Sequence, residues 1–212
     1  MRSRWLGIVA ALAAAIVSAA FWSKLPPEVV THWNLLGKAN GSSSRAWAAL
    51  AGPGIILGLT LLFQVVPRID PRRENYDKFR EVYWLVVNGL LLCLLVFHLA
   101  ILASGAGAAV SVQRVSAGCL AVLMLVLGNS LGRIRPNWFM GVRTPWTLES
   151  PEVWRRTHRV AAWLLVGAGV VTGTAALIRG VNPLGIGLGA VMVMAVVSIV
   201  VSYFFWLQER RS

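Results

Sequence analysis

Apolar residues occur along this chain in long runs that short polar segments separate. Six of these runs approach the roughly 20 residues that a helix needs to cross a bilayer. They extend from Trp5 to Trp22, Trp47 to Val66, Val82 to Ala103, Val112 to Leu131, Val160 to Ile178 and Leu184 to Leu207. The pattern therefore predicts an all-α, polytopic membrane protein with six transmembrane helices.

The composition supports this prediction, because 57% of the 212 residues are hydrophobic and only 13% are charged. Both cysteines, Cys93 and Cys119, fall within predicted spans, where small apolar packing residues are common. The three histidines, His32, His98 and His158, fall in an outer loop, a span and an inner segment. We therefore expect no disulfide framework, no metal site and no cofactor.

The distribution of positive charge predicts the orientation of the chain. Fifteen of the 20 Lys and Arg residues would lie on one side of the membrane and five on the other. The minority are Lys24, Lys38, Arg45, Arg114 and Arg179. Because cytoplasmic loops carry the excess of positive charge, both termini should be cytoplasmic. The net charge of +12 then indicates contact with anionic lipid headgroups, not with nucleic acid.

The first apolar run has a second possible interpretation. Arg2 and Arg4, followed by an apolar run and the small residues Ser18, Ala19 and Ala20, resemble a secretory signal peptide. Cleavage would leave five spans and an outer N-terminus. Because the apolar run is long for a signal core, we expect it to be a transmembrane helix.

The segment from Gly128 to Arg159 combines residues that cannot cross a bilayer. Its six arginines alternate with Trp138, Trp146 and Trp154, and three prolines interrupt it. Trp and Arg both favour the membrane interface, so we expect a folded interfacial loop at the inner face. Arg143 should contact backbone carbonyls or Glu149.

The sequence after this loop is typical of a helix start. Ser150 provides a capping hydroxyl, Pro151 suits the first helical position, and Glu152 lies near the positive end of the helix dipole. We expect this helix to continue into the fifth span.

Two other polar segments carry recognisable patterns. In the outer segment from Lys24 to Arg45, we expect order around Thr31 to Gly37 and a flexible return through Asn40, Gly41 and three serines. In the inner segment from Pro67 to Glu81, acidic residues recur at intervals of three and four, which predicts a solvated helix with one acidic face. These residues are Asp70, Glu74, Asp77 and Glu81.

The inner loop after the fourth span and the outer loop after the first span both resemble segments of one protein family. The inner sequence LGRIRPNWFMGVRTPWTL followed by SPEVWRRTHR is similar to the signature of the SdpI family of bacterial membrane proteins. The outer sequence LPPEVVTHWNLLGKANG resembles the uncharacterised domain often found at the N-terminus of that family. We therefore predict a two-helix unit over residues 1–66, a charged loop and third span over 67–111, and an SdpI-like unit over 112–212.

The resemblance implies a non-enzymatic immunity and signalling protein of the bacterial plasma membrane. Such a protein protects its cell from a secreted antimicrobial peptide and holds a winged-helix autorepressor at the membrane. The implied toxin-facing residues are His32, Trp33, Asn34 and Gly37. The implied partner-facing residues are Asn129, Arg133, Arg135, Asn137, Trp138, Gly141, Arg143, Thr144, Pro145, Trp146, Trp154 and His158.

A small-solute transporter or channel is the main alternative. It should place polar residues along the spans, and only Gln64, Asn88, His98 and a few hydroxyls qualify. Glu149, Glu152 and His158 could form an acid–base set, but no nucleophile motif accompanies them.

Overall fold

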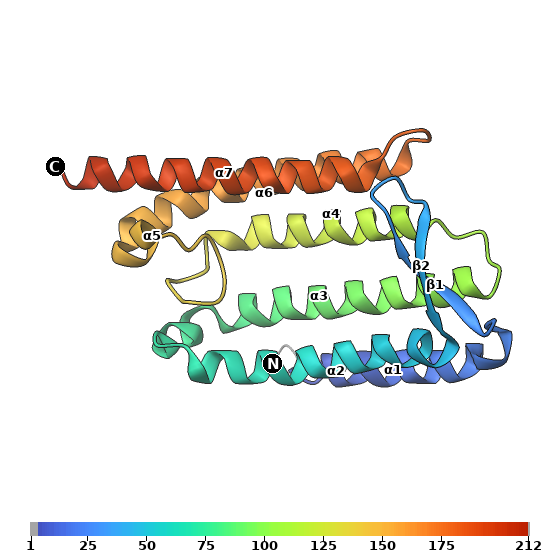
Figure 1. Ribbon diagram of the computed structural model, residues 1–212. Coiled ribbons are helices and arrows are strands. Elements are labelled where there is room, and N and C mark those ends of the chain that lie inside the picture. Colours follow the sequence, from blue (N-terminus) through green and yellow to red (C-terminus); the bar gives the residue numbers. More distant parts are fainter. Residues whose placement is uncertain (1–3, 212) are drawn as a thin grey trace.

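The computed structural model describes residues 4–211 and is a bundle of long helices with one small hairpin across one end (Figure 1). Within these residues, six helices are long and apolar enough to cross a membrane. They are α1 (Leu6–Phe21), α2 (Arg45–Ile69), α3 (Tyr76–Gly105), α4 (Val112–Leu131), α6 (Pro151–Leu177) and α7 (Pro183–Glu209). The prediction of a six-span helical membrane fold is confirmed.

Shorter elements connect these helices at the two ends of the bundle. The short helices are η1 (Trp22–Lys24), η2 (Arg73–Asn75) and α5 (Pro145–Glu149), and the strands are β1 (Glu28–Trp33) and β2 (Ala39–Ser44). We call the end that carries α5 the inner end and the end that carries the hairpin the outer end (Figure 1). The described Lys and Arg residues divide between these ends as predicted, and Arg2 lies outside the described residues.

The helices pack as two groups of three. α1, α2 and α3 contact one another, as do α4, α6 and α7, and α3 packs against α4 where the groups meet (Figure 1). A continuous core runs through both groups and includes Ile56, Leu91, Met124 and Leu165. The helix that the sequence places in the first span is therefore an integral part of the packing.

The outer hairpin replaces the flexible return expected after Asn40. β1 and β2 pair antiparallel, with Glu28 opposite Ser44 and Trp33 opposite Ala39. The prediction of flexibility was wrong because a polar Gly/Ser sequence gives no local signal for a strand whose hydrogen bonds come from a partner. Val29, which is buried against Leu25 and Leu102, anchors the hairpin to the bundle.

The inner segment between α2 and α3 also differs from the prediction. α2 continues through Pro67 to Ile69, and the next helical turn starts only at Arg73. Asp70 is therefore not on an exposed helix face, and its side chain is 2% exposed. Asp77 remains on the protein surface, where it pairs with Arg80 at 3.4 Å.

A polar contact joins three helices in the outer half of the first group. The Ser18 hydroxyl donates to the carbonyl oxygen of Ala49 at 2.7 Å and lies 2.8 Å from Nε2 of His98. Because its single proton is committed to Ala49, the hydroxyl must accept from the Nε2–H of His98. His98 is thus a hydrogen-bonded residue of the protein interior.

Replacement of Gly52 by Ala should weaken this contact. A Cβ at Gly52 would overlap the imidazole of His98, whereas a Cβ at Gly54 of the same helix meets nothing within 4 Å. We expect Gly52→Ala to lower the midpoint of thermal unfolding in detergent by about 2 to 10 °C, the range for overpacking. Gly54→Ala is the control and should leave the midpoint unchanged or slightly higher. Equal effects of the two substitutions would refute this description of the packing.

Candidate functional site

The candidate site is the inner loop, residues 132–150, which connects α4 to α6. Asn137 organises its first turn and is fully buried. Its Nδ2 donates to the carbonyls of Arg135 and Met140 at 2.9 and 3.0 Å, and its Oδ1 accepts from the backbone N–H groups of Phe139 and Met140. One amide side chain therefore serves as the hydrogen-bond partner of a non-helical turn.

His158 holds the next part of the loop from α6. Its Nδ1 lies 2.8 Å from the carbonyl oxygen of Trp154, and its Nε2 accepts from the backbone N–H of Val142 at 3.1 Å. These partners fix a neutral imidazole with the proton on Nδ1. Gly141 passes the ring with φ of +108°, and a Cβ there would overlap Nε2. Both features require glycine at this position.

Trp154 and two threonines complete the support of the loop. The Trp154 indole stacks on His158 with 4.0 Å between ring centroids, and its Nε1 donates to the carbonyl of Ile134 at 2.9 Å. Thr144 and Thr147 form a reciprocal capping box at the start of α5, where Pro145 occupies the first turn. The expected folded loop is therefore present, and Ser150 caps α6 as predicted.

Other candidate residues at the inner end have exposed side chains. Trp138 is 48% exposed. Asn129, Arg133, Arg135, Arg143 and Pro145 are exposed as well. Arg143 donates to the carbonyl of Trp138 at 2.6 Å, which confirms the first of its two expected partners. These exposed residues give the inner loop a basic and aromatic surface, which we call the inner surface. The buried residues Asn137, Trp154 and His158 support it.

The end of α7 contributes a contact that the sequence did not indicate. Trp146 packs against Tyr203 and Trp206, with ring centroids 5.1 and 6.4 Å apart. Glu149 accepts from Nε1 of Trp206 at 2.8 Å and pairs with Arg210 at 3.1 Å. These donors hold the pKa of the Glu149 carboxyl below its usual value. The aromatic residues of α7 suggest only a membrane belt when the sequence is considered alone.

The acid–base set suggested by Glu149, Glu152 and His158 does not form. Glu152 pairs with Arg155 at 2.5 Å, and both nitrogens of His158 bind backbone groups, Nδ1 that of Trp154 in α6 and Nε2 that of Val142 in the loop.

Asp70 attaches the inner loop to the first helix group. Its Oδ2 accepts from the backbone N–H of Trp138 and from the hydroxyl of Tyr76, both at 2.9 Å, and its Oδ1 accepts from the N–H of Arg72 at 2.7 Å. Asn75 adds a bond to the carbonyl of Pro136 at 2.8 Å. Sequence analysis missed this link because its partners lie more than 60 residues apart.

At the outer end, the candidate residues divide between structural and exposed positions. The Oδ1 of Asn34 accepts from the N–H groups of Leu36 and Lys38, both at 3.0 Å, and closes the turn between the strands. Gly37 occupies this turn with φ of +76°. His32 is exposed and Trp33 is half-buried. The turn therefore presents His32 and the exposed Leu36 at the surface.

Gln113 attaches the tip of this hairpin to the second helix group. Its Nε2 lies 2.9 Å from both the carbonyl of Leu35 and the Oδ1 of Asn182. Asn182 in turn accepts from the N–H of Gly185 and caps α7. A Cβ at Gly37 would lie 2.5 Å from Oε1 of Gln113, so a side chain at this position would displace the Gln113 amide.

Comparison with known proteins associates the two loops with established sequence families. Residues 133–205 match the SdpI/YfhL protein family, and residues 9–57 match a domain of unknown function (DUF1648). The chain is also 23% identical to Immunity protein SdpI of Bacillus subtilis (strain 168), and this similarity covers the full length of both proteins. The resemblance of this chain to the SdpI family is confirmed. No solved structure gives a significant match.

The SdpI match contains the inner loop from Arg133 onward together with α6 and most of α7. The match to the domain of unknown function contains most of α1, the hairpin and the first half of α2. Asp70 and Gln113 lie outside both matches, and each connects one matched region to the rest of the protein.

The substitution Asp70→Asn should locally release the inner loop from the first helix group. An amide nitrogen in place of Oδ2 would face the N–H of Trp138 with another donor, so the hydrogen bond would be lost. Loss of a hydrogen bond to a charged group costs about 1.5–3 kcal/mol of stability. We expect amide hydrogen exchange at Trp138 and Phe139 to accelerate about tenfold or more. Asp77→Asn is the matched control, because its exposed pair with Arg80 contributes little. Unchanged exchange in a folded Asp70→Asn protein would contradict the role of this carboxylate.

Proposed function

We propose that this protein is an integral membrane immunity protein that protects its cell from a secreted antimicrobial peptide. The observation that carries the proposal is similarity over the whole chain to a protein named as an immunity protein. We place it in the bacterial plasma membrane with both termini in the cytoplasm, because the inner end carries most of the positive charge. The hairpin then faces the outside, where a secreted peptide arrives.

The surface of the hairpin suits contact with an amphipathic peptide. Leu35 and Leu36 are 55% and 69% exposed at the tip, next to the polar edge of β1 that carries His32. Such a mixed surface contacts both apolar and hydrogen-bonding groups of a ligand. The turn at Asn34 and the hydrogen bond from Gln113 to the carbonyl of Leu35 hold the surface in place before any peptide binds. Preorganisation of this kind lowers the entropy cost of binding.

Protection can be tested by deletion of the gene and challenge with peptides secreted by the same strain and its relatives. We expect deletion to sensitise the cells and the intact chain to restore survival. His32→Ala and Trp33→Ala should fail to restore it while inserting normally, and Ser23→Ala, exposed nearby but outside the hairpin, should restore it fully. Survival that is identical with and without the gene across the panel would contradict immunity.

We further propose that the inner surface retains a cytoplasmic winged-helix repressor when toxin is bound outside. The two helix groups are linked at both ends, through Gln113 outside and Asp70 inside. A peptide that binds the hairpin can shift the packing of the groups and, through Asp70, the position of Trp138. The requirement is that peptide and repressor both bind one arrangement more tightly than the other. A simpler form of the proposal has immunity alone, by direct capture of the peptide.

Variants of the inner surface separate these two forms. Arg143→Gln and Trp146→Ala should abolish sedimentation of the repressor with membranes and leave resistance to the peptide intact. Arg143→Gln is the sharper variant, since Trp146 also packs against α7. Arg159→Gln, an exposed change at the same end, should retain both properties. Loss of resistance in a normally inserted Arg143→Gln protein would show that the two surfaces are not separate.

A further inference from the structure

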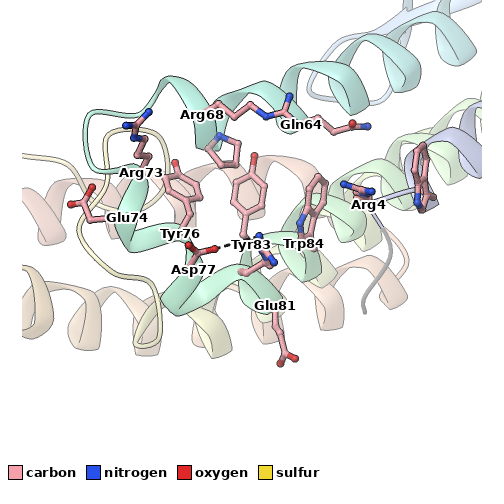
Figure 2. Close-up of a pocket in the computed structure, with 13 residues that line it drawn as sticks. Arg4, Gln64, Arg68, Arg73, Glu74, Tyr76, Asp77, Glu81, Tyr83 and Trp84 are labelled. Atoms are coloured by element: carbon pink, nitrogen blue, oxygen red, sulfur yellow. Dashed lines mark ion pairs between the residues drawn. The ribbon is translucent and has the colours of Figure 1, made fainter.

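A cleft of about 1080 Å³ opens at the inner end of the first helix group (Figure 2). It lies between the start of α1, the end of α2 and the first turns of α3. Gly7, near the start of α1, packs against Thr60, so α2 continues for more than two turns beyond this point. Among residues 4–211, α2 and α3 are the only long helices that line the cleft, because α1 begins only at Leu6.

The cleft is lined by four arginines and by the three carboxylates of Glu74, Asp77 and Glu81, of which Asp77 pairs with Arg80. Arg68 and Arg73 line it without an ion pair to any carboxylate of residues 4–211, and Arg4 lies over the ring of Trp5. Figure 2 shows the carboxyl group of Glu81 pointing away from Arg4, Gln64 and Arg68. The end of the cleft between Arg4 and Arg68 therefore offers two guanidinium groups and an amide to an anion. Guanidinium groups bind phosphate oxygens well because their N–H donors match the spacing of those oxygens.

The surroundings of this end match the environment of a lipid headgroup. Trp5 and Trp84 line the cleft, and such aromatic side chains favour the interface between headgroups and hydrocarbon. Leu61 and Val65 of α2 lie at helical spacing from Gln64 and Arg68 and are exposed. They form an apolar surface that leads from the cleft towards the middle of the membrane. A ligand with a phosphate and long apolar chains fits both parts.

We propose that this cleft binds one anionic phospholipid of the leaflet that contains it, with the headgroup phosphate between Arg4 and Arg68. The amide of Gln64 donates to the same phosphate, and an acyl chain lies along Leu61 and Val65. Basic sites between helices at membrane interfaces are typical positions for such headgroups. The lipid fills the space that the late start of α1 leaves open. The proposal does not depend on the identity of any toxin or repressor.

The test is native mass spectrometry of the full chain in micelles titrated with phosphatidylglycerol. We expect one phosphatidylglycerol to be retained per chain, and Arg68→Gln to weaken its retention about tenfold or more, since a charge-assisted contact is lost. Arg133→Gln, which removes an exposed charge at the same end but outside the cleft, is the matched control and should retain the lipid. The double variant Arg4→Gln, Arg68→Gln should retain none above background.

Four results would overturn the proposal. They are no retained lipid in the intact protein, equal retention of phosphatidylethanolamine, equal loss in Arg133→Gln, and displacement of the lipid by millimolar inorganic phosphate. The last result would identify a site for free phosphate. Thermal unfolding of the intact protein gives a second measurement that needs no variant. Its midpoint should rise with added phosphatidylglycerol and not with phosphatidylethanolamine.

Discussion

Backbone polar groups at the ends of the bundle must find partners without the regular hydrogen bonds of a helix, and this constraint shapes both loops. In the spans, helices satisfy the backbone internally. In the loops, single side chains take over this role: Asn34 outside, and Asn137, His158 and Asp70 inside. The loops thereby acquire a fixed shape near the membrane, where an unsatisfied amide is costly. The surfaces of the outer hairpin and of the inner loop therefore depend on these few side chains.

The same side chains also determine how the two helix groups are joined. α3 and α4 pack against each other, and the polar contacts between them include weak ones from the thiols of Cys93 and Cys119 to each other's backbone carbonyls, both at 3.6 Å. The hydrogen bonds of Gln113 and Asp70 are directional and join the groups at opposite ends. Relative movement of the groups must therefore strain at least one of these bonds. This arrangement gives a physical basis for coupling between the outer hairpin and the inner loop, whichever ligand each of them contacts.

The features predicted from the sequence are those whose cause is local. The six spans follow from runs of apolar residues, and the start of α6 follows from Ser150 and Pro151. The features that sequence analysis missed depend on distant partners. Asp70 looked like one of four acidic residues on a helix face, and only the packing of Tyr76 and Trp138 reveals its burial. β2 is a strand because β1 lies beside it, and its own sequence favours a linker.

The predicted site residues divide into two physical classes, and this division affects how their variants can be interpreted. Asn137, Thr144, Trp154 and His158 are buried and hold the inner loop, whereas Arg133, Arg135 and Trp138 are exposed. Substitution of a buried member deforms the loop and removes every function that depends on it. Such a loss says nothing about contact with a partner. Only the exposed members, changed in a protein whose loop remains protected from hydrogen exchange, can identify the surface that a partner binds.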